Sequence, residues 1–354
     1  MRARTCGRCG VPMRVVREHK WLDDGTITQA KNPDHRMVFI ESENINSTFS
    51  NIEEIIGLSI ERMVIEAKRR AAFDFIDHML PGIVKAVVRM IGLRPVIRNV
   101  ASLGRVMGYG DLTLVDLRRM HDQGDHATLL IREPYSLPLF CGDLAGTFEA
   151  IDRRDVGVEY EKVSSDSYRI TGVISKHPLE LRERLQTRTY SHKPGGIAYK
   201  TCPSCGGPED LSQYGWDLER GVVMDKIYDR RMALLGPAAL EAVIDDLEEE
   251  LGDTIPRVII EAQRRFVKTG FYTLEEVSSL EKFRAALAIR GMGNLREMDW
   301  NEKGLKIRIE NPCLYQVLVG LVQGFLELAS GREARVDWEL VEDNDLSVEV
   351  ALVN

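Results

Sequence analysis

The sequence has no long apolar run, no apolar leader and none of the common enzyme motifs. No apolar stretch approaches the roughly 18 residues that suggest a membrane-spanning helix. Residues 1–6 contain two arginines and lack the apolar core of a signal peptide, so we expect a cytoplasmic protein with no membrane partner. The patterns G-x-S-x-G, H-E-x-x-H and G-x-x-x-x-G-K-[ST] are absent, which argues against a hydrolase or nucleotide enzyme and favours a function other than catalysis.

Net charge and cysteine usage narrow the class of protein further. The formal net charge is −8, which argues against a nucleic-acid partner, because phosphate binding needs clustered lysine and arginine. The chain has six cysteines, and a reducing compartment argues against a disulfide framework. Four of the cysteines stand in two C-x-x-C pairs, a spacing that indicates metal or redox chemistry.

The most informative feature of the chain is a long internal repeat. The segment TCGRCGVP at residues 5–12 returns as TCPSCGGP at residues 201–208, a shift of 196 positions. The match continues through tryptophan, arginine and glycine positions: Trp21 with Trp216, Arg36 with Arg231, Gly57 with Gly252, and 65–67 with 260–262. A period this long excludes a solenoid and predicts two domain-sized copies that pack as an internal pair.

The second part of each copy matches at a smaller shift. Three pairs share a shift of 178, namely Ile131 with Ile309, Gly142 with Gly320, and Val158 with Val336. Because the shift falls from 195 to 178, the first copy contains 17 additional residues between about positions 77 and 125. We therefore predict a first unit over residues 1–175, a linker over 176–200 and a second unit over 201–354.

The predicted elements follow the same order in both copies, and the fold class is α+β. Each copy begins with a cysteine turn, a hairpin, a short strand and two helices, and ends with a strand, a helix and a closing hairpin. The first hairpin is predicted at 15–28. Helices are predicted at 44–56, 59–80, 83–93, 98–106, 137–151, 237–251, 255–267 and 314–330, and the last strands form two closing antiparallel hairpins at 156–175 and 335–353.

The cysteine pairs predict a zinc site. Two thiolates three positions apart on a tight turn can bind one tetrahedral zinc ion from the same side, and a closed structural site needs four such ligands. Each copy supplies two, and the second copy contains no histidine. The economical arrangement is one shared structural zinc site, made where a twofold relation between the copies brings together Cys6, Cys9, Cys202 and Cys205.

Other interpretations of the cysteines stay open. Two separate sites could be completed by water, carboxylates, His19 or His35. Four thiolates could also hold an iron–sulfur cluster. A thioredoxin-like dithiol is disfavoured, because no helix begins directly after either pair to lower a cysteine pKa. Cys141 and Cys313 are not repeated, and we interpret them as buried apolar residues.

Repeated arginines and two unrepeated histidines are further candidates for a site. The arginines could bind an anion, but helical acids stand near enough in sequence to pair with them, Glu66 beside Arg69 and Glu261 beside Arg264. His121 and His126 lie in a segment rich in aspartate and glycine that is typical of a turn. A second metal site at these histidines is the alternative interpretation.

Three segments of the first copy carry a family resemblance: LFCGDLAGTFEA at 139–150, GVEYE at 157–161 and RITGVI at 169–174. They resemble the 4-vinyl reductase (V4R) domain, and residues 318–328 and 336–351 are similar to it more weakly. The resemblance implies a fold like that of nitric-oxide-sensor and Golgi-transport ligand-binding domains, and a small hydrocarbon or aromatic ligand. Members often have cysteines in the closing hairpin, whereas 156–175 and 335–353 contain none. The C-x-x-C turns would have to replace them.

These expectations describe a zinc-stabilised protein in which two V4R-like units form a pseudo-dimer and bind a small apolar, aromatic or tetrapyrrole-like molecule. We expect the ligand pocket in the first copy, lined by Tyr109, His126, Tyr135 and Phe140. One alternative is an enzyme or enzyme accessory acting on an aromatic or tetrapyrrole substrate. Another is a metal-linked structural subunit without a ligand. The chain could also assemble as a homodimer.

Overall fold

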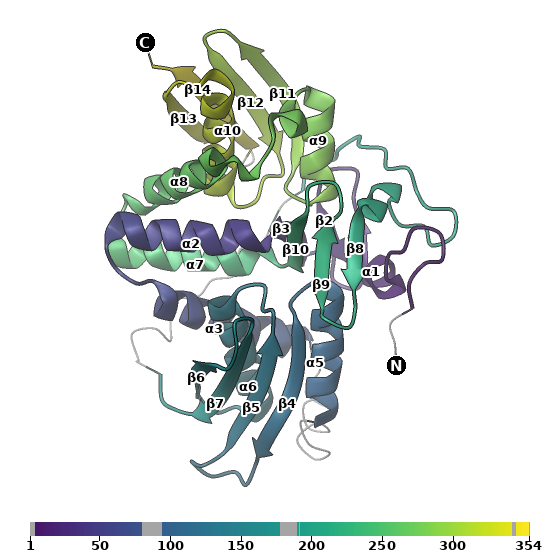
Figure 1. The fold of residues 1–354 in the computed structure, drawn as a ribbon, viewed down its shortest axis with the longest axis vertical. Coiled ribbons are helices and arrows are strands. Elements are labelled where there is room, and N and C mark those ends of the chain that lie inside the picture. Colours follow the sequence, from purple (N-terminus) through teal and green to yellow (C-terminus); the bar gives the residue numbers. More distant parts are fainter. Residues whose placement is uncertain (1–3, 80–93, 178–189, 191, 342–344, 354) are drawn as a thin grey trace.

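A six-stranded antiparallel sheet lies at the centre of the computed structural model, which describes residues 4–79, 94–177, 190, 192–341 and 345–353 (Figure 1). The strand order is β1-β2-β3-β10-β9-β8. The six strands are β1 His19–Trp21, β2 Ile27–Gln29, β3 Arg36–Glu41, β8 Tyr214–Asp217, β9 Val222–Asp225 and β10 Arg230–Leu235. The predicted α+β class is confirmed, and the sheets are antiparallel.

The central sheet joins the first half of the chain, residues 4–177, to the second half, residues 190–353. Residues 38–41 of β3 pair with residues 232–235 of β10, so that Ile40 lies opposite Ala233. All six residues of β3 are buried. Its continuous apolar run over 37–40 is typical of a strand that is covered on both faces. The junction between the halves is therefore part of the protein core.

Each half continues from the central sheet into two helices, α2 Ser42–Ile56 and α3 Glu61–Met79 in the first half and α7 Pro237–Leu251 and α8 Ile255–Phe266 in the second. Gly57 adopts a φ of 72° and ends α2, as glycine does at helix ends. Pro237 begins α7, where its missing N–H costs nothing. The helices pack across the halves, since α2 contacts α8 and α3 contacts α7.

The first lobe, at the bottom of Figure 1, is formed by α3 with residues 94–177. Its four-stranded sheet has the order β4-β5-β7-β6, and α6 packs closely against α3. Its further elements are α5 Arg94–Met107, β4 Asp111–Arg118, β5 His126–Arg132, α6 Leu137–Asp152, β6 Val156–Lys162 and β7 Ser167–Ile174.

The second lobe, at the top of Figure 1, comprises residues 255–341 and 345–353. Its sheet has the order β11-β12-β14-β13, which corresponds to that of the first lobe, and α10 packs against α8 as α6 does against α3. Besides α8, its elements are α9 Leu280–Ile289, β11 Asn294–Asn301, β12 Gly304–Glu310, α10 Tyr315–Ser330, β13 Ala334–Val341 and β14 Asp345–Leu352.

The two halves exchange contacts reciprocally around the centre. Trp21 of the first half donates from Nε1 to the carbonyl of Ile289 at 2.9 Å, and Trp216 of the second half donates to the carbonyl of Val106 at 3.1 Å. The turn at Gly25 also lies directly against the other half. A Cβ atom added to Gly25 would lie only 2.5 Å from the carbonyl oxygen of Gly293. Each half therefore seats its N-terminal strands on the lobe formed by the other half.

The additional residues of the first half fall in two places. Two glycines with positive φ precede β4, namely Gly108 and Gly110. The glycines that precede β11, Gly291 and Gly293, also have positive φ and stand 183 positions later. The shift therefore falls from 195 to 183 between the helices and these glycines, and from 183 to 178 across the next hairpin. The β4–β5 turn occupies 119–125, whereas the β11–β12 turn occupies only 302–303.

Several elements differ from the predicted ones. The predicted hairpin at 15–28 begins with a short helix, α1 Met13–Glu18, and only β1 and β2 form its strands. Strands β4 and β11 and helix α9 were not predicted. Both strands contain a register shift, at 114–116 and 295–297, which breaks the alternation that identifies a strand. The helix predicted at 83–93 lies outside the described residues.

Of the predicted linker at 176–200, the structure describes residues 176–177, 190 and 192–200. Buried His177 contacts the Glu149 carboxylate, and Tyr190 donates its hydroxyl to Glu241. The amides of Gly196 and Ile197 both donate to the carbonyl of Asp23, at 2.9 and 2.8 Å. These parts of the linker are packed against the protein. The unit boundaries at 175 and 201 stay predictions.

Candidate metal centre

The structure brings the four cysteines of the two C-x-x-C pairs together. Their sulfur atoms all lie within 4.8 Å of one another. Across the halves, Cys6 Sγ lies 3.9 Å from Cys202 Sγ, and Cys9 Sγ lies 3.6 Å from Cys205 Sγ. The predicted meeting of the two pairs is thus confirmed, although 196 positions separate them.

Each cysteine turn is closed by the same backbone contacts. The amide of Cys6 donates to the Val11 carbonyl and the amide of Gly10 donates to the Cys6 carbonyl, at 2.8 and 2.9 Å. Cys202 and Gly206 repeat this pattern in the second turn. Gly10 and Gly206 both have a φ of 76°, a left-handed conformation that glycine adopts without a steric penalty. The turn geometry therefore explains why a glycine follows each C-x-x-C pair.

Backbone hydrogen bonds and burial act on the thiols in opposite directions. The amides of Cys9 and Arg8 lower the pKa of Cys6 to about 6, and the amide of Ser204 lowers the pKa of Cys202. Burial raises the pKa of Cys9 to about 12 and also raises that of Cys205. Four thiolates at this spacing repel one another, so a cation is needed to deprotonate the whole set.

The sulfur spacing fits a tetrahedral metal ion. With zinc–sulfur bonds of about 2.3 Å, the edge of a regular tetrahedron of sulfurs is about 3.8 Å. The two distances across the halves, 3.6 and 3.9 Å, lie on either side of this value. Four thiolates would fill the coordination shell and leave no position for a substrate or water. Such a site can stabilise the fold but offers no open position for metal-assisted chemistry.

The histidines considered as additional ligands lie elsewhere. His19 is buried and donates from Nδ1 to the Val15 carbonyl at 3.1 Å. His35 lies against Phe75 with ring centroids 4.5 Å apart and the rings tilted by 33°, and burial lowers the pKa of His35 to about 4. Within the described residues, the four cysteines are the only group of three or more metal-ligating side chains. One shared site therefore accounts for both pairs.

The residues predicted to line a ligand pocket are only partly together. The rings of Tyr109 and Tyr135 stack with centroids 4.4 Å apart, and the Tyr135 hydroxyl donates to Asp143 at 3.0 Å. Tyr135 and Phe140 are buried in one core cluster, against which Tyr109 packs. This core cluster contains residues of both halves, so the three side chains belong to the shared core or pack against it. A ligand role for them stays a prediction.

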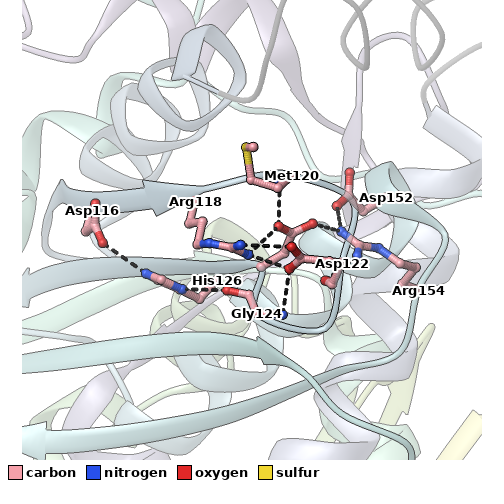
Figure 2. Close-up of polar contacts among 9 residues, drawn as sticks. Asp116, Arg118, Met120, Asp122, Gly124, His126, Asp152 and Arg154 are labelled. Carbon is pink, nitrogen blue, oxygen red and sulfur yellow. Dashed lines mark hydrogen bonds and ion pairs between the residues drawn. The ribbon is translucent and has the colours of Figure 1, made fainter.

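His126 is the first residue of β5, and Figure 2 shows the polar residues around it. Its Nε2 contacts Asp116 at 2.9 Å and its Nδ1 contacts the Gly124 carbonyl at 3.0 Å. The hydrogen bond from His126 lowers the pKa of Asp116, and the same contact raises the pKa of His126. Both ring nitrogens are occupied by the protein, so this histidine has no free nitrogen for a metal.

The turn beside His126 is held by an ion-pair network. Arg118 contacts Asp122 and Asp125, and Arg154 contacts Asp125 and Asp152 (Figure 2). His121 lies in the same turn with a φ of 61°. The predicted turn is therefore present, and its acidic residues are neutralised by arginines of the first lobe.

Among the repeated arginines, Arg69 and Arg264 pair with acids, as we interpreted them. For Arg36 and Arg231 this interpretation is wrong, because both donate to backbone carbonyls of the opposite half. Arg69 contacts Glu66 at 2.9 Å and Glu149 at 2.5 Å. In the second lobe, Arg264 contacts Glu261 at 2.7 Å and Glu327 at 2.5 Å. The sequence reasoning named the near acids and missed Glu149 and Glu327, although these two match at the shift of 178.

Two hollows were not expected from the sequence. An apolar crevice of about 30 Å³ lies among α2, α7 and α8, where Asn44 and Thr48 are its polar lining. A groove of about 380 Å³ lies on the sheet of the second lobe. It is lined by Lys306 and Arg308 of β12 and by residues of the neighbouring strands. Arg308 there is paired with Asp345 at 2.9 Å. Neither hollow could be predicted from the sequence, because each is lined by residues that are far apart in the chain.

Within the described residues, no helix has both the length and the apolar character needed to cross a bilayer. We also compared the chain with models of known protein families, with curated proteins and with solved structures, and found no match in any of the three.

Proposed function

We propose that the protein is a zinc-stabilised binding protein in which one structural zinc ion, held by Cys6, Cys9, Cys202 and Cys205, joins the two halves. The observation that carries this proposal is the convergence of four sulfurs within 4.8 Å from opposite halves of the chain. The thiolate set suits zinc, and it would suit an iron–sulfur cluster as the alternative. Absorbance separates the two metals, because a zinc–thiolate site is colourless in visible light.

We also propose that the two halves arose by duplication of a V4R-like unit. The matching strand orders of the two lobes support this proposal, as do the reciprocal contacts of Trp21 and Trp216. The ion pairs of Arg69 and Arg264 with acids at matched positions add to it. The resemblance of residues 139–174 to the V4R domain gives the reason to expect a small apolar or aromatic ligand.

The zinc proposal is tested by metal analysis of the purified chain. We expect one zinc per chain, and loss of that zinc in Cys202→Ser, because three thiolates no longer close the site. The free energy of unfolding should fall by about 4 kcal/mol, the contribution of a ligand present at about 1,000 times its Kd. Urea denaturation of reduced protein measures this change.

Ser204→Ala is the matched control, since Ser204 is exposed in the same turn. This variant should keep its zinc and its stability. Wild-type protein that binds no zinc when it is supplied under reducing conditions would contradict the proposal. Retention of zinc by Cys202→Ser at the wild-type affinity would contradict the four-cysteine site.

The apolar crevice among α2, α7 and α8 is the place where we propose a ligand binds. Its apolar lining includes Ile45, Leu240 and Ile259, and both halves contribute to it. About 30 Å³ holds only about two water molecules, so an aromatic ligand would require these helices to separate. Native mass spectrometry of the purified chain would detect a retained ligand.

A metal-linked structural subunit without a ligand is the second candidate function. It is favoured by the packing of Tyr109, Tyr135 and Phe140 in the core shared by the two halves, where a pocket was expected. A chain that binds zinc and shows no ligand of any mass would support this candidate over the first.

A further inference from the structure

We infer that peroxide oxidises the four-cysteine metal site to two disulfides, each of which joins a cysteine of the first half to one of the second. This inference rests on the proposed zinc site, and it adds a response to oxidation at that site. It follows from which sulfurs face each other, and from which of them solvent can reach.

The facing sulfurs belong to opposite halves. Cys9 and Cys205 have sulfurs 3.6 Å apart, and Cys6 and Cys202 have sulfurs 3.9 Å apart. A disulfide needs a separation of about 2.05 Å, so each pair has to close by less than about 2 Å. The backbone turns that carry the cysteines are already in place on both sides. Oxidation can therefore join the halves without unfolding either turn.

The two facing pairs differ in exposure. The Cys6 and Cys202 residues are only 5% and 1% exposed, whereas Cys9 and Cys205 are partly exposed. Peroxide from solvent therefore reaches Cys9 and Cys205 first. Oxidation of these two ligands leaves the metal ion with an incomplete coordination shell. The buried pair becomes available for oxidation only after the metal has left.

The chemistry balances with hydrogen peroxide as the oxidant. A thiolate of the exposed pair attacks one peroxide oxygen, the O–O bond breaks, and a sulfenic acid and hydroxide form. The facing thiolate attacks that sulfur and expels the second hydroxide, which forms the S–S bond. Two sulfurs lose two electrons and, with two protons, one peroxide becomes two water molecules. A second peroxide oxidises Cys6 and Cys202 in the same way, and zinc leaves as the aqueous ion.

The consequence is that the junction survives loss of the metal. A link between Cys9 and Cys205 bridges the same two turns that the zinc ion bridges. A disulfide within one turn, for example between Cys6 and Cys9, would leave the two cysteine turns without a direct bond to each other. Because the facing pairs cross the halves, the oxidised protein keeps both lobes attached to the centre.

The test treats zinc-loaded full-length protein with stoichiometric hydrogen peroxide. Zinc release is followed with a chelating dye, and the alkylated protein is digested with trypsin without reduction. Arg8 stands between Cys6 and Cys9, so these residues fall in separate peptides, 5–8 and 9–14, whereas Cys202 and Cys205 share the peptide 201–220. The linked peptides therefore distinguish a disulfide across the halves from one between Cys6 and Cys9, and fragmentation of peptide 201–220 assigns the bond to Cys202 or Cys205.

We expect the link between 9–14 and 201–220 to appear first, followed by the link of 5–8 to the same peptide. One equivalent of zinc should be released in total, and thiol reductant with added zinc should restore the metal site. The double variant Cys6→Ser/Cys202→Ser retains the exposed pair and should form its cross-half link even without metal. Ser204→Ala should behave as the wild type does.

Peptide 5–8 linked to 9–14 would overturn the inference, because it shows a disulfide within one turn. Cysteines oxidised to sulfinic acid without any link would overturn it too. Both outcomes leave the zinc proposal intact if the untreated protein contains one zinc per chain. An untreated protein that cannot bind zinc refutes the proposed function instead, whichever disulfides form afterwards.

Discussion

Arg36 and Arg231 show at the residue scale how the halves hold each other. The Arg36 guanidinium donates to the carbonyls of Pro312, Gly291 and Asn311, at 3.0, 2.8 and 2.6 Å. Arg231 makes the corresponding contacts with carbonyls at 108, 133 and 134 in the first lobe. The planar guanidinium has five N–H donors, so one side chain can satisfy several buried carbonyls at once.

Replacing Arg36 with methionine should lower the free energy of unfolding by about 3 kcal/mol, because buried carbonyls lose a charged donor. Arg36 is 2% exposed, so water cannot substitute for it. Urea denaturation measures the change. The control is Arg335→Met, whose side chain is 79% exposed and should change stability by less than about 0.5 kcal/mol. Equal effects of the two variants would argue against the role given to Arg36.

In both lobes, two helices pack in close contact at a glycine: α6 against α3 in the first lobe and α10 against α8 in the second. A Cβ on Gly146 of α6 would lie 2.0 Å from the Arg69 carbonyl oxygen of α3. A Cβ on Gly320 of α10 would lie 2.4 Å from the Ile260 carbonyl oxygen of α8. In both cases the nearest atom is a backbone carbonyl oxygen, which cannot move aside as the end of a flexible side chain does. Small residues at these positions thus set the distance between the paired helices.

Gly146→Ala should destabilise the first lobe by about 1–3 kcal/mol, since the added methyl group forces α6 away from α3. Gly104→Ala is the matched control within a helix, because its Cβ would meet the nearest atom of Tyr109 at an ordinary 3.6 Å. That control should gain up to about 1 kcal/mol from helix propensity. Thermal denaturation compares the two, and a stabilising Gly146→Ala would refute the tight contact.

The whole molecule is held together by exchange between its halves. The strands at 19–41 sit on the second lobe and those at 214–235 sit on the first, while α2 contacts α8 and α3 contacts α7. Neither half can leave without exposing the buried strands β3 and β10. Within the part of the chain that the structure describes, the lobes are therefore coupled through the shared core.

We expect the zinc-loaded chain to unfold in one transition in urea. Tryptophan fluorescence reports the centre through Trp21 and Trp216 and the second lobe through Trp300 and Trp338, whereas far-ultraviolet circular dichroism also reports the helices of the first lobe. The two signals should give the same midpoint, because the shared core couples the parts. Midpoints that differ beyond error would show that one lobe unfolds alone.

The cysteine cluster was predictable from the sequence because the inference needed only a repeat and the four-ligand rule for zinc. The α+β class followed from the helix periodicity at 44–56 and 237–251 and from the two closing hairpins. The exchange between halves was not predictable: a repeat shows that two segments are alike, but not which copy of a helix each one contacts. β4 and β11 were missed because their bulges interrupt alternation, and Tyr109 could not be assigned to a pocket or to a core from its type.

The pairing of β3 with β10 also bears on synthesis of the protein. The partner of β3 is about 190 positions downstream, so at ribosomal rates of about 5–20 residues per second the apolar strand waits about 10–40 s for it. During that time its unpaired edge is exposed to other nascent chains. This topology therefore leaves an apolar strand edge unpaired early in synthesis, however stable the finished protein is.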